Sequence, residues 1–401
     1  MLQNDLILFV EINYSKYLFV TGRFDENHNF KVMEKIIVPN KKDTNNYLLL
    51  NIDQAQDIIK KNVQLLEDKL NCIYKEVIVI LDNFEYTSIN ISGSKRLNGS
   101  QILKENISYI LNFLKLEIIE NEKEKSILQI FNSRSILDGK RVENLPIGLF
   151  GDFYSHELTF FLIKNNDLKN IKKIFNKNNL YINKILTKDF IEGTQIINKN
   201  KNSETFFKIK IYKDSSSISY FENASFKFIN HFKFGSNIIL SDICKVCSIE
   251  KRLIENILSD TIFKNENIDE SDFLEEKYFV KGNYKKIKKS LIIEIVNARI
   301  EEMINIIFEK NINITSLKKK IDDIVYLNLE DRSISSNFGK NFYNYFIERN
   351  NLKISFIDNF SIEDLIICAS RLSTFGWKKE AIPITQTKNS LITRIFKSIF
   401  E

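Results

Sequence analysis

The sequence predicts an α/β protein that is built from two related halves. Three strand-like segments follow one another between residues 6 and 38, and the same pattern returns between residues 206 and 232. After the first set, a helical pattern at 52–70 precedes a continuous apolar run at 77–81, as expected for a buried strand. Strands that alternate with helices in this way are typical of α/β domains.

The first half opens with a predicted hairpin. Residues 6–12 and 17–24 form its strands, a tight turn at 13–15 joins them, and residues 30–38 supply a third strand. Residues 52–70 place apolar side chains at helical spacing, which predicts an amphipathic helix. These side chains are Ile52, Ala55, Ile58, Ile59, Val63, Leu66 and Leu70.

Residues 84–163 are predicted to form a separate module inserted into the first half. This segment contains a strand-like sequence at 86–91, a predicted helix near 100–114, a second strand-like sequence at 126–136 and a further segment at 143–163. A helix near 167–175 and a strand near 182–187 then continue the first half.

The second half repeats the opening of the first and then becomes more helical. Its predicted strands lie at 206–211, 217–221, 226–232, 324–327 and 352–356. A turn at 235–237 leads into a helix, and further helices are predicted at 290–308, 337–348 and 362–376. Recurrence of the strand pattern is the reason for expecting two related halves.

Composition places the chain among globular proteins and limits its partners. Of its 401 residues, 43% are hydrophobic and 27% are charged. The formal net charge of +6 is modest, and no basic stripe with interleaved aromatic side chains is present, so nucleic acid is not an expected partner. No apolar run is long enough to span a bilayer, and the first residues lack the basic region of a signal peptide.

The cysteines and histidines do not predict a metal centre. Cys244 and Cys247 form a lone CxxC pair without a second pair or a nearby histidine. His28, His156 and His231 have no partner at metal-ligand spacing. We therefore expect free thiols in a reducing cytoplasm, no bound metal at these residues and no catalytic histidine.

The last twelve residues, 390–401, predict a short amphipathic helix. Its apolar stripe consists of Leu391, Ile392, Ile395, Phe396, Ile399 and Phe400, and Arg394 and Lys397 lie on the opposite face. Such a helix is about 18 Å long, which is too short to cross a bilayer core of about 30 Å. A basic amphipathic helix of this kind suits the interface of an anionic membrane.

The segment before this helix decides between two interpretations of it. A terminal helix with one apolar face can pack on its own domain, or it can lie in a membrane. Residues 378–389 are polar, contain Pro383 and show no periodicity, which predicts a tether. The tether favours a membrane-targeting role for residues 390–401.

The order of these segments resembles the bacterial cell-division protein family FtsA, whose members have the actin-like ATPase fold. The residues that carry the resemblance are Asn144–Gly151, with a Pro-x-Gly-x-x-Gly turn, the strand Ser155–Ile163 after it, Gly235–Ile243, Ile295–Glu302 and Ser373–Gly376. Nearly the whole chain can be laid on this family.

The resemblance implies an actin-like, ribonuclease H-like fold in two domains. Residues 1–83 and 164–204 would form the first half, and residues 84–163 an inserted subdomain of the FtsA type. Residues 205–377 would form the second half, in which 245–315 make a smaller partner-docking subdomain. The linker 378–389 and the amphipathic helix 390–401 complete the expected organisation.

The resemblance also implies a function, namely peripheral membrane tethering in cell division. Members of the family bind the C-terminal tail of the tubulin-like protein FtsZ, self-associate and recruit later division proteins. We accordingly expect this chain at the division septum, on the cytoplasmic face of the inner membrane, where its tail would meet anionic lipids.

The family's ATP site has altered counterparts in this sequence. Glu11, Asn13, Ser15 and Lys16 occupy the first phosphate turn, where Asn13 stands in place of the family's glycine. Asp214 and Ser215 fall in the second turn, whose three glycines are missing and whose magnesium-associated acid is replaced by Lys210. Glu255 matches the adenosine-side glutamate, whereas Leu258 stands where a lysine is usual.

Phosphate turns need glycine because backbone N–H groups must approach the phosphates closely. We therefore expect ATP and Mg²⁺ to bind weakly or not at all, and we do not expect an enzyme. Two alternatives stay open. One is a scaffold similar to the pilus-assembly protein PilM, which binds a short peptide from a membrane protein. The other is an active actin-like ATPase or a sugar-kinase-like phosphotransferase.

Overall fold

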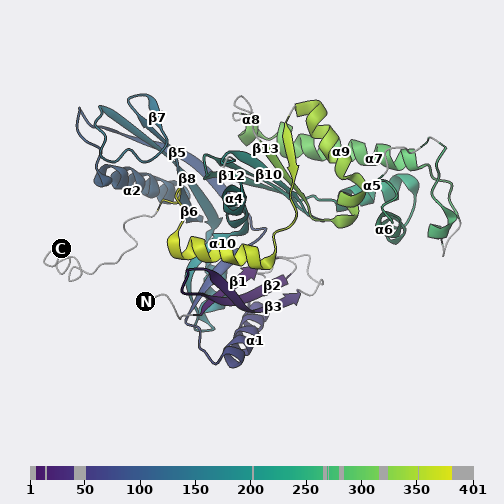
Figure 1. Cartoon of the computed structure of the whole chain (residues 1–401), viewed down its shortest axis with the longest axis horizontal. Coiled ribbons are helices and arrows are strands. Elements are labelled where there is room, and N and C mark those ends of the chain that lie inside the picture. The colour runs from purple at the N-terminus through teal and green to yellow at the C-terminus, as the bar shows by residue number, and fades with distance from the viewer. Residues whose placement is uncertain are drawn as a thin grey trace. The chain divides into compact units, whose positions relative to one another are not determined.

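The computed structural model describes residues 6–13, 16–39, 51–200, 203–264, 269, 271–279, 284–315, 324–350 and 352–381 (Figure 1). The chain divides into two compact units. The first contains residues up to 191, the short stretch 224–228 and the residues from 366 onward. The second contains residues 192–223 and 229–365. The predicted helix at 390–401 lies outside the described residues.

The first unit contains a five-stranded mixed sheet with the order β3-β2-β1-β4-β9. β1 pairs antiparallel with β2, and β2 with β3, whereas β1, β4 and β9 run parallel. The predicted hairpin, third strand and buried strand are confirmed. The strands are β1 (Ile7–Ile12), β2 (Lys16–Phe24), β3 (Phe30–Pro39), β4 (Glu76–Leu81) and β9 (Tyr181–Thr187).

Helices α1 (Ile52–Leu70) and α3 (Asn165–Asn176) pack their apolar residues into the core of this unit. The Asn51 side chain caps α1 by accepting a hydrogen bond from the Gln54 backbone N–H at 3.1 Å. At the other end, Asn71 adopts the left-handed conformation with φ of 48°. These two caps explain why the helix begins and ends at these residues.

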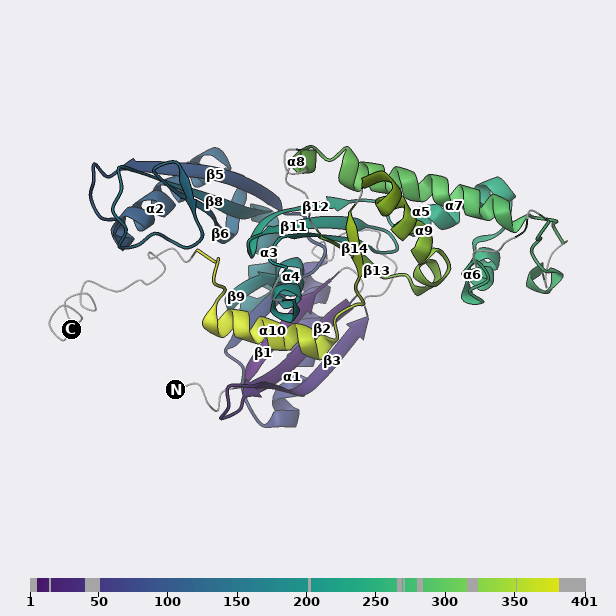
Figure 2. The same cartoon turned by 45° about the horizontal axis from the view of Figure 1, so that its top comes forward.

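Residues 87–164 form a second, four-stranded sheet with the order β5-β8-β6-β7, and α2 covers one face of it (Figures 1 and 2). A Cβ atom at Gly93 of β5 would lie 2.6 Å from Ile110 of α2, so glycine permits this close packing. The elements are β5 (Thr87–Arg96), α2 (Lys104–Asn121), β6 (Lys125–Leu137), β7 (Lys140–Val142) and β8 (Phe153–Lys164).

The third sheet repeats the strand order of the first, β12-β11-β10-β13-β14. Here β10 pairs antiparallel with β11 and parallel with β13, which in turn is parallel to β14. The repeated strand pattern in the sequence thus corresponds to a repeated topology. The strands are β10 (Phe206–Ile211), β11 (Ser216–Glu222), β12 (Ser225–Phe232), β13 (Ile324–Leu329) and β14 (Lys353–Phe356).

Several helices accompany this sheet, and α7 and α9 pack side by side (Figure 2). α9 begins five residues earlier than the sequence predicts, because the Asp331 carboxylate accepts a hydrogen bond from the Ser333 backbone N–H at 3.1 Å. The elements are α5 (Asn237–Cys247), α6 (Lys251–Ser259), the 3₁₀ turn η1 (Glu276–Phe279), α7 (Lys289–Ile304), the π-helical turn η2 (Asn305–Glu309), α8 (Ile312–Thr315) and α9 (Arg332–Asn350).

Two further helices are α4 (Lys188–Lys199) and α10 (Ile362–Phe375). After α10, the chain returns to the inserted sheet. The Ala381 N–H donates to the Ile130 carbonyl at 2.8 Å, and the Asn132 N–H of β6 donates to the Lys379 carbonyl at 2.7 Å. The first four residues of the predicted linker, 378–381, therefore belong to the folded first unit. The linker prediction missed this pairing because its partner strand lies far away in the sequence.

No helix in the described part of the chain is long and apolar enough to cross a membrane.

Candidate functional site

The first candidate turn lies at the carboxyl end of β1. Glu11 is the penultimate residue of this strand and only 2% exposed. The Asn13 N–H donates to the Lys16 carbonyl at 3.2 Å, which closes the turn into β2. Ser15, also predicted for this site, lies outside the described residues.

Two residues that the sequence analysis did not select also lie at this edge of the sheet. Because β1, β4 and β9 are parallel neighbours, their carboxyl ends meet there. Asp82 directly follows β4, and Lys188 directly follows β9 as the first residue of α4. The side chains of Asp82 and Lys188 therefore converge on Glu11.

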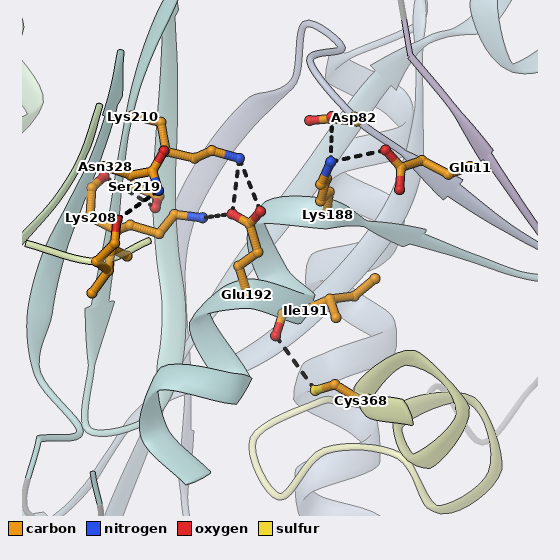
Figure 3. Close-up of polar contacts among 11 residues, drawn as sticks. Glu11, Asp82, Lys188, Ile191, Glu192, Lys208, Lys210, Ser219, Asn328 and Cys368 are labelled. Atoms are coloured by element: carbon orange, nitrogen blue, oxygen red, sulfur yellow. Dashed lines mark hydrogen bonds and ion pairs between the residues drawn. The ribbon is translucent and has the colours of Figure 1, made fainter. Parts of the chain in front are cut away.

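The Lys188 ammonium group lies between two buried carboxylates (Figure 3). Its Nζ atom donates to Glu11 Oε1 at 2.9 Å and to Asp82 Oδ2 at 2.8 Å. The Asn13 side-chain amide donates to the same Asp82 oxygen at 2.7 Å. A buried carboxylate is costly unless it is paired, so Lys188 compensates the charge that this edge of the sheet collects.

The second candidate turn, Tyr212–Ser215, is tied to the start of α5. The Ser236 N–H donates to the Tyr212 carbonyl at 2.8 Å, and the Asn237 N–H donates to the Lys213 carbonyl at 2.9 Å. Asp214 accepts a hydrogen bond from the Asn237 side chain at 2.6 Å. Ser215 contributes its backbone carbonyl to the turn, accepting from the Tyr212 N–H at 2.9 Å. Two backbone carbonyls and the Asp214 carboxylate of this turn thus accept hydrogen bonds from the start of α5.

The strand before this turn carries two buried lysines, and both pair with Glu192 of α4 (Figure 3). Lys208 Nζ lies 2.7 Å from Glu192 Oε2, and Lys210 Nζ lies 3.0 Å from Glu192 Oε1. Lys210 also lies over the Tyr212 ring, 4.8 Å from its centroid. The residue at the magnesium-associated position is therefore a cation engaged by the protein's own carboxylate.

Glu255 and Leu258, the residues that the resemblance places on the adenosine side, differ in their exposure to solvent. Glu255 is an exposed residue of α6, whereas Leu258, one turn later, is fully buried. Asp331 is buried and accepts a hydrogen bond from the Ser236 hydroxyl at 3.1 Å. Asp331 thus holds the start of α5 and, as described above, caps α9.

These residues do not fit ATP with Mg²⁺ in the way that the sequence resemblance implies. The two carboxylates at the first edge of the sheet already hold an ammonium group, and the second edge presents lysines where an acid would be needed. In addition, the second turn directs backbone carbonyls toward the start of α5. A phosphate–metal complex would have to displace these internal contacts, so no catalytic step through a nucleotide is derived.

Within the described residues, no group of three or more histidine, cysteine, aspartate or glutamate side chains could hold a metal ion. Burial raises the pKa of the Cys244 and Cys247 thiols, which disfavours the reactive thiolate. Burial lowers the pKa of His156 to about 4, so its imidazole is neutral at physiological pH.

The sequence contains a signal for these buried ion pairs, although the predicted site did not include them. Lys208 and Lys210 occupy alternate positions of an otherwise apolar strand, and so require a carboxylate if the strand is buried. Asp82 and Lys188 each follow a strand without an intervening residue. Charged residues at parallel strand ends are candidates for mutual pairing once the strand order is known.

Comparisons of the chain with known proteins give similarity at the level of the fold. The sequence matches no family model and no curated protein. The structure is similar to that of a PilM–PilN type IV pilus biogenesis complex, with 11% identity, a TM-score of 0.52, and coverage of 93% of this chain and 97% of that chain.

Other solved structures are similar at lower scores. An ethanolamine utilization protein EutJ from Carboxydothermus hydrogenoformans has 10% identity and a TM-score of 0.42, with 94% of this chain and 91% of that chain covered. A Bacteroides thetaiotaomicron protein with an actin-like ATPase fold and unknown function has 12% identity and a TM-score of 0.38, covering 90% and 96%.

The duplicated strand order and the similarity over nearly the whole length define the fold of the protein. The chain has the actin-like ATPase fold, as the sequence predicts.

Proposed function

We propose that this chain is a scaffold of the actin-like superfamily that does not hydrolyse nucleotide. The observation that carries the proposal is the position of Lys188, whose ammonium group engages both Glu11 and Asp82. Hydrolysis in a site of this type would require these carboxylates to organise a hydrated Mg²⁺. An internal lysine that holds them supports a role in assembly instead of turnover.

Within this class, we infer that the chain tethers FtsZ filaments to the cytoplasmic face of the inner membrane at the division septum. The order of the FtsA-like sequence motifs and the amphipathic character of residues 390–401 support this inference. The partners would be the C-terminal tail of FtsZ, further copies of this chain, later division proteins and anionic lipids.

The energetics of the tail favour a collective mechanism. Each of its six apolar side chains contributes about 1.5–3 kcal/mol if fully buried. An interfacial helix immerses them only in part and must also offset the entropy of helix formation. One copy should bind reversibly, whereas many copies on one filament gain avidity without any new contact.

Filament recruitment tests this function directly. Full-length protein is mixed with fluorescent FtsZ filaments and anionic vesicles, and the fluorescence on the vesicles is measured. Recruitment that disappears when the chain is truncated after Asn389 is the expected result. If the folded full-length protein recruits no filaments, the FtsZ tether is wrong.

A second candidate is a scaffold of another membrane-associated assembly, comparable to the PilM–PilN complex. A cleft of 810 Å³ in the first unit favours this candidate. It combines apolar side chains with a basic rim, which suits a peptide that carries both apolar and acidic residues. The lining includes Lys115, Ile119, Lys123, Lys125, Leu128, Leu168, Lys172, Ile182, Lys184, Ile185 and Glu380.

Two results would separate the candidates. A peptide-binding scaffold would bind acidic, partly apolar peptides in a fluorescence polarisation assay, and charge reversal of Lys115 and Lys172 would weaken that binding. It would also not need residues 390–401 for its attachment to membranes. Loss of vesicle recruitment on truncation after Asn389, without peptide binding, would favour the FtsZ tether.

The enzyme alternative is tested with nucleotide. Isothermal titration with Mg-ATP is expected to show no low-micromolar binding, and a phosphate-release assay no turnover above background. Low-micromolar binding of Mg-ATP to the unmodified chain would contradict the expectation that nucleotide binding is weak or lost. Measurable turnover would establish an ATPase.

A further inference from the structure

We propose that Lys188 is a tethered cation that keeps the Glu11–Asp82 pair closed to free divalent metal ions. This inference rests on the proposed non-hydrolysing function and explains how the first half of the fold does without Mg²⁺. Its test measures metal binding instead of filament recruitment, so either proposal can fail alone.

The geometry of the carboxylates is the first argument. One nitrogen atom lies 2.9 Å from an oxygen of Glu11 and 2.8 Å from an oxygen of Asp82. The two carboxylates are therefore no farther apart than these two distances together. They are 2% and 1% exposed, so water screens their mutual repulsion poorly. A cation between them offsets this repulsion.

The position of Lys188 on its helix is the second argument. Lys188 is the first residue of α4, and the positive end of a helix macrodipole disfavours a cation there. Its side chain is also largely buried, since only 17% of it is exposed. The two carboxylates offset both costs, which indicates that this ammonium group is placed for them.

The chemistry of the oxygens is the third argument. Mg²⁺ and Mn²⁺ prefer carboxylate and carbonyl oxygen ligands. Glu11 and Asp82 supply carboxylates, and Asn13, which contacts Asp82, carries an amide oxygen that could turn toward a metal. These three side chains carry the oxygen ligands that such ions prefer, and the lysine ammonium group occupies the position between the two carboxylates.

The test uses the full-length protein and Mn²⁺ as the probe. Isothermal titration and thermal unfolding are measured with MnCl₂ or with EDTA, for the unmodified chain and for Lys188→Ala. We expect Lys188→Ala to bind one Mn²⁺ per chain at least about tenfold more tightly than the unmodified chain. We also expect EDTA to lower its melting temperature and Mn²⁺ to restore it, with no such dependence in the unmodified chain.

Matched variants separate this site from general metal binding. Adding Asp82→Asn to Lys188→Ala should abolish the tight Mn²⁺ binding. Lys184→Ala lies four residues earlier and removes an ammonium group from one carboxylate, Glu380, at 3.0 Å. Because one carboxylate makes a poor metal site, this control should bind Mn²⁺ as the unmodified chain does.

A second variant keeps the proposal testable if Lys188→Ala does not fold. Lys188→Gln keeps a side chain that can donate to the carboxylates but removes the charge, and the same gain in Mn²⁺ binding is expected. The proposal is overturned if neither folded variant binds Mn²⁺ more tightly than the unmodified chain. It is also overturned if the unmodified chain binds one Mn²⁺ tightly and Asp82→Asn removes that binding.

Discussion

The Nζ atom of Lys208 lies 2.7 Å from the Oε2 atom of Glu192. The lysine is on a strand and the carboxylate is on α4. The arrangement at Lys188 is the reverse, because there the lysine is on α4, one carboxylate is near the end of β1 and the other directly follows β4. Lys188 and Glu192 are four residues apart, one turn on the same helix. α4 therefore supplies the complementary charge to each of two buried clusters.

The Glu192→Gln variant is expected to destabilise the second unit. The change removes the acceptor charge of two lysines whose side chains are 0% and 5% exposed. Removing one partner of a buried ion pair costs about 3–5 kcal/mol. Urea unfolding followed by circular dichroism measures the loss.

The matched control is Glu275→Gln in the same unit. Glu275 pairs with Lys277 at 2.9 Å, but both side chains are more than half exposed. Surface pairs of this kind contribute about 0–1 kcal/mol. Equal losses of unfolding free energy in the two variants would show that the buried cluster contributes no more to stability than the surface pair does.

The stability of the inserted sheet is expected to depend on the protonation of His156. Burial lowers the pKa of this imidazole from 6.5 to about 4, and the nearby Glu157 opposes the shift only in part. The unfolded chain therefore binds the proton first as the pH falls. The contribution of the neutral imidazole is complete above pH 6.5, decreases as the pH falls toward 4, and amounts to about 3 kcal/mol in total.

His156→Leu removes this titration. Between pH 7 and pH 5, the unmodified chain should lose about 2 kcal/mol more of its free energy of unfolding than the variant does. His28→Asn is the control, because His28 is exposed and its φ of 58° suits asparagine. If the pH dependence of His156→Leu equals that of the control, His156 is not its source.

The close approach of Gly235 to the second turn predicts a sharp effect of Gly235→Ala. A Cβ atom there would lie 2.2 Å from the Tyr212 carbonyl oxygen and 2.7 Å from the Lys213 carbonyl carbon. These are backbone atoms, so the turn itself must move. We expect a loss of about 1–3 kcal/mol in urea unfolding.

Gly339→Ala is the corresponding control in helix α9. A Cβ atom at Gly339 meets nothing within 4 Å, and alanine is the better helix former by about 1 kcal/mol. This variant should be as stable as the unmodified chain or more stable. Destabilisation of both variants to the same extent would contradict the packing argument at Gly235.

The proposed membrane tail predicts the behaviour of two further variants. Phe396→Asp places a charge in the apolar stripe, and charge reversal at Arg394 and Lys397 removes the attraction to anionic lipid. Both should abolish co-sedimentation with anionic liposomes while circular dichroism stays unchanged. If either variant still pellets with the liposomes, the anchor role of residues 390–401 is wrong.

Local patterns in the sequence predicted most of the secondary structure. The apolar spacing at 52–70 became α1, and the run at 77–81 became the buried strand β4. Such elements bury a face that repeats with their own period, so short windows of sequence contain the signal. The boundaries of α2 and α9 were less accurate, because their first turns depend on single side chains, Asn106 and Asp331.

The candidate site was predicted only in part. Glu11 lies near the end of β1, Asn13 and Asp214 lie in the two turns, and the absence of glycine from both turns is visible in the sequence. Lys188 pairs with Glu11, which is 177 positions away in the sequence, and with Asp82, which is 106 positions away. Such partners follow from strand order, which a local pattern does not contain.

The sequence by itself determined the duplicated strand pattern, the amphipathic spacing of residues 390–401 and the absence of glycine from residues 11–16 and 210–215. Each of these depends on neighbouring residues and on the intrinsic freedom of the backbone. Only the tertiary structure decided that Lys188 fills the carboxylate pair, that Glu192 receives two strand lysines and that residues 378–381 pair with β6. Buried charges and strand edges require partners, and the folding of the whole unit determines which partners come within reach.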